Sequence, residues 1–224
     1  MYIPQQTPGE SGRSYALRAI KEGIIRLELA PGTRVSESAL AAELGLSRTP
    51  VGESLNELSR SKIVEIYPQK GSFIALIDYD LVEEARFIRE VLECAVVELV
   101  CAQAGPEDLR VLDENVKLQK YYLSNPDPDM LLRLDNEFHR TLFTIARKTQ
   151  AHAMMESTSI HFDRVRHMSL STVKDLKIIQ DHQKILDAIA AKDAKAASMY
   201  MREHLDRWKV DENVIRNKYP DYFK

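Results

Sequence analysis

The stretch Glu43-Leu44-Gly45-Leu46-Ser47-Arg48-Thr49-Pro50-Val51-Gly52-Glu53-Ser54-Leu55 decides the fold of the N-terminal third of this chain. It has the pattern of a helix end, a short turn and the start of a second helix. Gly45 supplies the left-handed residue that ends the first helix. Ser47 stands at the N-cap position of the second, and Pro50 falls in its first turn, where a missing N–H costs nothing. We therefore predict a helix-turn-helix whose recognition helix begins near Arg48.

A β-hairpin is predicted directly after these helices. Two β-rich runs, at residues 63–67 and 72–77, are separated by Pro68-Gln69-Lys70-Gly71, which has a glycine in its turn. Such a hairpin would place a basic wing beside the recognition helix. A three-helix core with a merely stabilising hairpin is the alternative, but the two features together favour DNA binding.

Residues 31–37, 40–41, 44–51 and 71–75 together resemble the winged helix-turn-helix of the GntR family of bacterial transcription regulators. The resemblance covers about the first third of the chain. It implies that the protein binds double-stranded operator DNA. A symmetric homodimer would place two recognition helices on an inverted repeat. The positions that the resemblance assigns to DNA contact are Arg34, Ser47, Arg48, Thr49 and Gly71.

The chain departs from the family pattern at Gly52, where family members usually have an arginine. A lost bidentate arginine–guanine contact removes about 1–3 kcal/mol of discrimination between bases. A glycine inside a helix costs up to ~1 kcal/mol more. We therefore keep open a regulator that binds its ligand but reads DNA weakly, or at a different site.

The composition is that of a globular protein with material for a sizeable core, at 44% hydrophobic and 29% charged residues. No apolar run reaches the ~20 residues of a membrane span, and the N-terminus lacks a signal-peptide pattern. We expect a cytoplasmic location and no membrane partner. Cys94 and Cys101 are expected on one helix face, too far apart to bridge each other, and therefore reduced. Basic and acidic residues balance in the N-terminal third, so any positive surface must come from their arrangement.

The predicted fold is mainly α, in three segments. Residues 1–11 are predicted to form a flexible arm, residues 12–78 the winged helix-turn-helix, and residues 79–224 an all-α bundle. The bundle is expected to hold about six helices, because helical periodicity is almost continuous from Leu81 onward. We place two of them near residues 150–170 and 173–191, and the last one from about residue 194 to beyond residue 208. The tail, residues 218–223, either docks or frays.

Polar residues interrupt the apolar stripes of three bundle helices. Asp135 and His139 are four residues apart and so share one helix face. His182 and His204 each interrupt a stripe on a later helix. A single such histidine is usually a hydrogen-bonded core residue, but buried polar groups on three helices could instead surround one cation. Three imidazoles and a carboxylate suit Zn²⁺, Ni²⁺, Fe²⁺ or Mn²⁺.

The C-terminal two-thirds resembles the ligand-sensing FCD domain of FadR-type GntR regulators, in its shorter six-helix form. The resemblance rests on residues 134–139, 182–189 and 201–205, and it implies that Asp135, His139, His182 and His204 bind the metal. It also implies a small carboxylate effector, such as a sugar acid, with Arg89 near it. An ion pair of Arg89 with Glu93 in solvent is the alternative. His161 is expected to line the cavity, whereas His152 and His167 are expected at the surface.

Together these features predict an effector-controlled transcription regulator and not an enzyme, and the family resemblance implies that it is a repressor, as most members are. The rival interpretation is a metalloenzyme in which Asp135 and the three histidines activate water. Against it, the sequence has no His-Glu-x-x-His pattern, and Glu137 points off the face that the ligands share.

Overall fold

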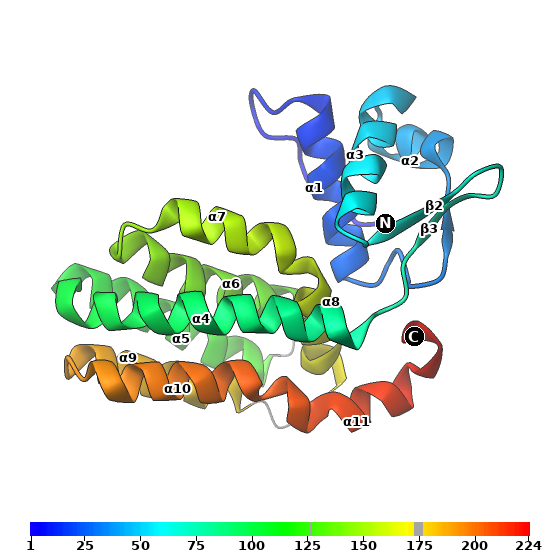
Figure 1. The fold of residues 1–224 in the computed structure, drawn as a ribbon. Coiled ribbons are helices and arrows are strands. Elements are labelled where there is room, and N and C mark those ends of the chain that lie inside the picture. Colours follow the sequence, from blue (N-terminus) through cyan, green and yellow to red (C-terminus); the bar gives the residue numbers. More distant parts are fainter. Residues whose placement is uncertain (126, 173–176) are drawn as a thin grey trace. The chain divides into compact units, whose positions relative to one another are not determined.

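Two compact units make up the chain: Met1–Val82 with Tyr219–Lys224, and Glu83–Lys218 (Figure 1). They are seen in a computed structural model that describes residues 1–125, 127–172 and 177–224. The first unit is a helix-turn-helix with a small antiparallel sheet, and the second is a helical bundle. The predicted fold class is thus confirmed. The predicted arm at residues 1–11 stays a prediction.

The helix-turn-helix is formed by α1 (Gly12–Ile25), α2 (Glu37–Leu44) and α3 (Arg48–Arg60). Gly45 ends α2 with φ 66° and ψ 30°, the left-handed conformation predicted for it. Ser47 occupies the N-cap position of α3, but its side chain makes no capping hydrogen bond. The predicted capping role of Ser47 is therefore wrong. The hydroxyl is exposed, so water can take over the free N–H groups of the first turn.

The sheet has the strand order β1-β3-β2, with both pairs antiparallel. The predicted hairpin is present as β2 (Val64–Tyr67) and β3 (Gly71–Ile74). The third strand, β1 (Arg34–Val35), was not predicted, because two residues are too short to show an alternating pattern. β1 places Arg34 opposite Phe73 in the sheet.

The C-terminal tail docks on the first unit, which settles the choice between docking and fraying. The Ile77 N–H donates to the Tyr222 carbonyl at 2.8 Å, and the Lys224 N–H donates to the Ile77 carbonyl at 3.0 Å. The ring of Phe223 stacks on Tyr79, with the ring centres 5.1 Å apart. The tail thereby adds a short parallel pairing to the chain just before α4.

The described residues contain eight helices from α4 onward, where about six were expected. The expected helix near residues 150–170 is broken at Ser159, whose hydroxyl donates to the Met155 carbonyl of the preceding turn. The last helix is broken at Arg207. The expected start at residue 173 lies outside the described residues. The helices are α4 (Tyr79–Gln103), α5 (Pro106–Ser124), α6 (Pro128–Ile145), α7 (Thr149–Thr158), α8 (Ile160–Thr172), α9 (Ile178–Ala190), α10 (Ala194–Asp206) and α11 (Trp208–Lys218).

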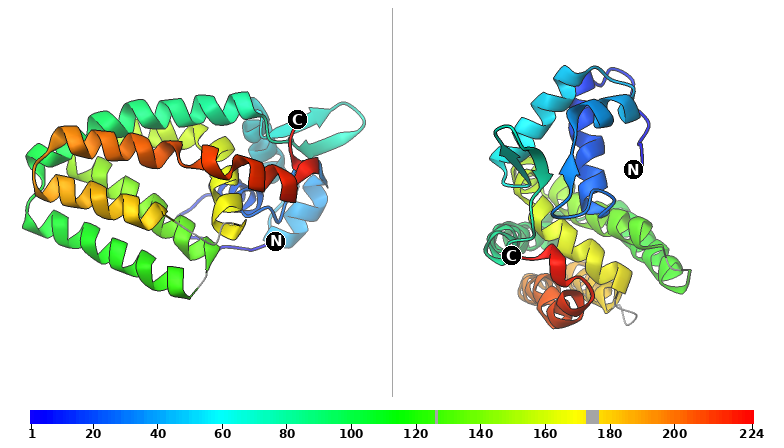
Figure 2. Two further views of the ribbon diagram at one scale, coloured as in Figure 1. Left: turned by 90° about the horizontal axis from the view of Figure 1, so that it is seen from below. Right: turned by 90° about the vertical axis from the view of Figure 1, so that its right-hand side faces the viewer.

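The bundle core lies between antiparallel neighbours. α9 packs along α10 and α5, while α6 packs on α5 and α8 (Figure 2). α8 is buried all round over residues 160–168. Cys94 and Cys101 on α4 are buried and unbridged, as predicted. Among the described helices, none combines the length and apolar character needed to cross a membrane.

Gly52 lies inside α3, where only the flexible end of the Glu37 side chain would meet an added Cβ, at 3.2 Å. We expect Gly52→Ala to raise the free energy of unfolding by about 0.5–1 kcal/mol, because alanine favours a helix more than glycine does. Gly45→Ala is the matched comparison. It should destabilise, because Gly45 has a positive φ. Thermal or urea unfolding of the two variants checks the opposite signs, and equal signs would contradict this account of α3.

Candidate metal centre and DNA-reading face

Four buried side chains meet in the bundle from three helices. α6 contributes Asp135 and His139, α9 contributes His182, and α10 contributes His204. None is more than 6% exposed. One nitrogen or oxygen atom from each lies within 4.8 Å of those from the other three. The cluster predicted from sequence is therefore assembled in the folded chain.

The histidine side chains converge through the same ring atom. His139 Nε2 lies 3.0 Å from His204 Nε2, and His182 Nε2 lies 3.3 Å from the same atom. Asp135 completes the group, with Oδ1 3.4 Å from His182 Nε2 and Oδ2 3.7 Å from His139 Nε2. A ligand set of three imidazole nitrogens and one carboxylate oxygen is one that divalent transition metals accept.

Neighbouring side chains fix the tautomers of two of these histidines. The Nδ1 atom of His139 contacts Glu93 Oε2, a carboxylate oxygen that can only accept a proton. The Nδ1 atom of His182 lies 2.8 Å from Gln119 Oε1. Gln119 is oriented in turn, because its Nε2 donates to Asn115 Oδ1 at 2.6 Å. Both histidines therefore carry their proton on Nδ1 and turn an Nε2 lone pair into the cluster.

Burial keeps the three imidazoles neutral. It lowers the pKa of His182 and His204 well below the usual value. The nearby side chains of His139, Arg166 and Arg89 lower both pKa values further. For His139, burial also lowers the pKa, although Glu93 opposes it. Burial would raise the pKa of Glu93, but Arg89 and His139 outweigh that effect and bring it to about 2. The centre thus combines neutral imidazoles with an ionised second layer, as a metal site needs.

The cluster fits a bound cation better than it fits a closed hydrogen-bond network. Two unprotonated Nε2 atoms cannot both bond to one neighbouring nitrogen at 3.0 and 3.3 Å, because His204 has at most one proton there. Asp135 Oδ1 and His204 Nδ1 receive no hydrogen bond from the described residues. A cation at the centre would satisfy the converging lone pairs together.

Two buried arginines lie close to the ring of Phe162 beside the centre. Arg89 donates to Glu93 at 2.7 Å, so the predicted ion pair forms, but it is buried and not solvated. Arg166 contacts Asp135 Oδ2, and its guanidinium carbon lies 6.0 Å from the centre of the Phe162 ring. Arg89 lies 5.5 Å from the same ring.

Several residues of this site were not found from the sequence. Arg166 and Gln119 sit in helical stretches whose charged or amide residues look like ordinary surface positions. Glu93 was noticed only as a partner of Arg89. The signal that could have revealed them is helical spacing against the ligands, but it depends on which helices pack together.

Three other histidines lie in the bundle. His161 is buried on α8, with its Nδ1 3.3 Å from Arg164 Nη2. His152 and His167 were expected at the surface, and this is wrong, since each is only 8% exposed. His152 packs against the ring of Phe143, and His167 Nε2 lies 3.0 Å from Asp129 Oδ1. Their neighbours in sequence are charged or small, which suggests exposure, but side chains of α6 lie against both rings.

The residues predicted to contact DNA lie at the surface of the first unit. Ser47, Arg48 and Thr49 are exposed at the start of α3. Arg34 is exposed on β1, and its Nε lies 3.0 Å from where a Cβ at Gly71 would be. Gly71 has φ 103°, so glycine is required both by the backbone and by the guanidinium packed over it.

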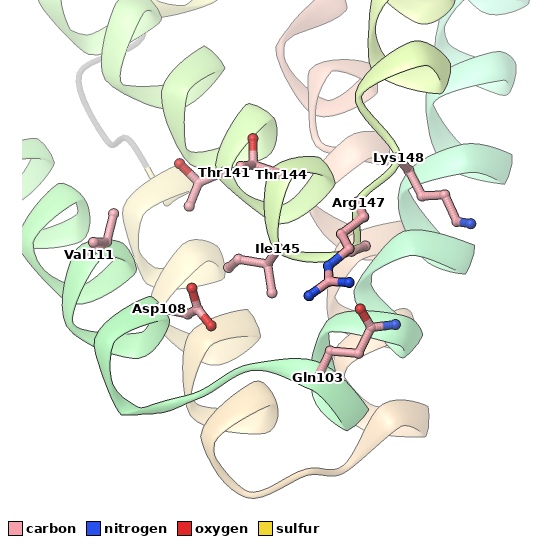
Figure 3. A pocket seen from close by; sticks show the side chains of 9 residues that line it. Gln103, Asp108, Val111, Thr141, Thr144, Ile145, Arg147 and Lys148 are labelled. Carbon is pink, nitrogen blue, oxygen red and sulfur yellow. The ribbon is translucent and has the colours of Figure 1, made fainter.

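A pocket of about 1020 Å³ lies at one end of the bundle, where α4, α5 and α6 approach each other (Figure 3). Three of its polar side chains form hydrogen bonds within the protein. Thr141 and Thr144 donate to carbonyls of the preceding turn, and Asp108 accepts from the Gly105 N–H. None of the four cluster residues lines it. We therefore assign the candidate ligand site to the buried cluster.

A winged helix-turn-helix followed by a helical domain with a buried polar centre defines the class of ligand-responsive transcription regulators. Residues 14–74 match the family described as bacterial regulatory proteins of the gntR family. Residues 84–207 match the FCD domain. The chain belongs to the GntR family, in its FCD-containing, FadR-type branch.

Proteins of similar sequence match this chain over nearly its whole length. An HTH-type transcriptional regulator in an unstable DNA locus of Streptomyces ambofaciens is 32% identical, covering 97% of this chain and 92% of the relative. The HTH-type transcriptional repressor RspR of Escherichia coli K12 is 28% identical, covering 98% and 96%. The structure of E. coli McbR/YncC matches with a TM-score of 0.80 at 20% identity, covering 94% and 99%, which supports the fold. The relatives are transcription regulators and not enzymes, so the metalloenzyme alternative is not supported.

The neutral buried histidines predict how stability depends on pH in metal-free protein. The unfolded chain takes up protons near pH 6.5, whereas folded His182 and His204 do so only at lower pH. Folded stability is therefore complete above pH 6.5 and falls as the pH drops below it, by up to about 1.4 kcal/mol per pH unit for each histidine. Urea unfolding in chelator between pH 7.5 and 5 measures the slope. A flat profile there would contradict the buried, neutral cluster.

The contact between Gln119 and His182 predicts that Gln119 affects metal affinity without binding the metal itself. Gln119→Leu removes the acceptor that holds the His182 Nδ1 proton, and we expect zinc affinity to fall roughly 10–100-fold. Competition with a chromophoric chelator measures it. Gln183→Leu is the control, because Gln183 is a half-buried amide on α9 with partners outside the cluster, Lys120 and Asp187. Equal losses in both variants would argue against tautomer control by Gln119.

Proposed function

We propose that this protein is a homodimeric transcriptional repressor that binds an inverted-repeat operator and responds to a small carboxylate effector at a metal centre. The observation that carries the proposal is the convergence of three Nε2 atoms and Asp135 beside two buried arginines. The metal and the effector would then bind in the helical bundle, and DNA would bind the helix-turn-helix unit.

The DNA-contacting part is the start of α3 together with the sheet. Arg48 and Thr49 are exposed on the first turn of α3, where a recognition helix presents side chains to base edges. Ser47 leaves its hydroxyl and the free N–H groups of that turn available for phosphate. Arg34, held over Gly71, would contact the backbone from the sheet. These roles agree with those that the family resemblance implies.

The metal would be held by Asp135, His139, His182 and His204, with zinc, nickel, manganese or iron as the candidates. Four protein ligands leave coordination positions open in the metals that accept five or six. When bound, the ion supplies a Lewis-acidic receptor for an oxygen of the effector. Glu93 and Gln119 hold the imidazoles in place for it.

The charge of the buried network favours an anionic effector. The two arginines, Arg89 and Arg166, stand against three carboxylates, those of Glu93, Asp135 and Asp163. A divalent ion changes this balance from one excess negative charge to one excess positive charge. An anionic effector would then reduce the excess positive charge, which is costly in a buried site. Arg166 can fork onto such a carboxylate if it leaves Asp135.

Regulation requires that the effector favour one arrangement of the two units over another. Only a ligand that binds two states with different affinity can shift the equilibrium between them. α4 begins in the DNA-binding unit and carries Arg89 and Glu93 in the other, so it connects the two sites along the chain. The relative RspR is named a repressor, which supports the same sign of regulation here.

A thermal-shift screen tests the proposal. We expect no response to small carboxylates from chelator-treated protein and a rise in Tm after reloading with zinc, nickel or manganese. A ligand at a hundredfold excess over its Kd adds about 2.7 kcal/mol to the free energy of unfolding. A carboxylate that stabilises the chelator-treated protein equally would contradict a metal-dependent effector site.

Arg166→Lys tests whether Arg166 binds the carboxylate effector at the same site. It keeps the charge and loses the planar fork, so the carboxylate Kd should rise roughly tenfold while zinc still binds. Arg202→Lys is the control, because Arg202 is 63% exposed and pairs with Glu90. An unchanged carboxylate Kd in Arg166→Lys would remove Arg166 from the effector site.

A further inference from the structure

Gly52 leaves a gap on the recognition helix, and the Glu37 side chain covers that gap. Gly52 lies one turn beyond Arg48, on the same face of α3. A Cβ at position 52 would lie 3.2 Å from Oε1 and 3.6 Å from Oε2 of Glu37. Both carboxylate oxygens therefore face this turn of the helix, although Glu37 belongs to α2.

The same carboxylate lies next to the guanidinium of Arg48. Glu37 Oε2 is 3.5 Å from Arg48 Nη2. Neither group is enclosed, since 43% of the Glu37 side chain and 73% of the Arg48 side chain are exposed. An acceptor and a donor thus stand side by side on the surface where α3 would meet DNA.

This pairing is complementary to one edge of a base pair. In the major groove, guanine presents two acceptors, N7 and O6, while its partner cytosine presents the N4 amino donor. Arginine suits the guanine acceptors, and a carboxylate suits the cytosine donor. Arg48 and Glu37 together supply both kinds of group.

We propose that Glu37 is a base-reading residue, which accepts a hydrogen bond from cytosine N4 while Arg48 contacts guanine in the same or the adjacent base pair. The inference rests on the proposed DNA-reading function of α3. An arginine at position 52 would give Glu37 a second cation and fill the space in front of it. Gly52 therefore removes one donor from the groove face and leaves an acceptor accessible there.

The test is selection of binding sites from randomised double-stranded DNA by the full-length protein, with and without zinc. We expect the wild type to select a G·C pair at one position of each half-site. Glu37→Gln should lose about tenfold of the preference at that position and keep the rest of the motif. Glu53→Gln is the matched control, since it removes an equal charge from the exposed face of α3. It should leave the selected motif unchanged.

A chemical substitution in the DNA provides a second measurement. N4-methylcytosine at the selected position replaces the groove-facing hydrogen of the amino group. It should weaken wild-type binding about tenfold and leave Glu37→Gln almost unaffected. Circular dichroism and Tm of each variant establish that it is folded.

The outcomes separate the two proposals. A wild-type protein that selects no motif under either condition overturns DNA reading by α3, and the role of Glu37 with it. A wild-type motif that Glu37→Gln selects unchanged, or equal sensitivity of both proteins to N4-methylcytosine, overturns the role of Glu37 alone.

Discussion

The bundle depends on one constraint: three imidazole lone pairs and a carboxylate must share one small volume away from water. Burying unsatisfied polar groups costs several kcal/mol, and burying them with converging lone pairs costs more. A cation removes both penalties at once. Because the ligands come from α6, α9 and α10, the free energy of metal binding would be shared with the packing of those helices. Two further helices are linked to the cluster, because Glu93 on α4 contacts His139 and Gln119 on α5 contacts His182.

The same constraint would make the proposed effector site sensitive to a change of charge at its centre. Arg166 contacts Asp135 of the cluster and also donates hydrogen bonds to Asp163 and Asn136. A change in the charge at the centre must be answered by a movement of this guanidinium, because buried charges cannot be left uncompensated. Arg166 belongs to α8, which packs on both α6 and α11. A local exchange of partners thereby reaches α11, which contributes none of the four cluster residues.

Much of this arrangement could be read from the sequence, and the limits have a physical pattern. Local rules worked where the determinant was local: Gly45 adopts the left-handed turn, and Asp135 and His139 share one helix face. The local rules failed where packing or solvent determines whether a side chain forms a hydrogen bond or is buried. Ser47 has the right chemistry for a cap but makes no capping bond, and His167 follows a charged arginine in sequence but is buried in the bundle. The tautomer-fixing role of Gln119 could not be derived, because it depends on α5 lying against α9.

The DNA-binding unit raises the opposite question, namely how a surface with balanced charge can hold DNA. Non-specific affinity comes chiefly from neutralised phosphates, and a unit with few excess cations gains little from that source. Its specificity must therefore come from base contacts, each contributing about 1–3 kcal/mol. An acidic side chain at the groove is repelled by phosphates, and the nearby guanidinium of Arg48 offsets part of that repulsion. The carboxylate of Glu37, paired with Arg48 beside an empty position 52, is consistent with a surface that trades affinity for selectivity.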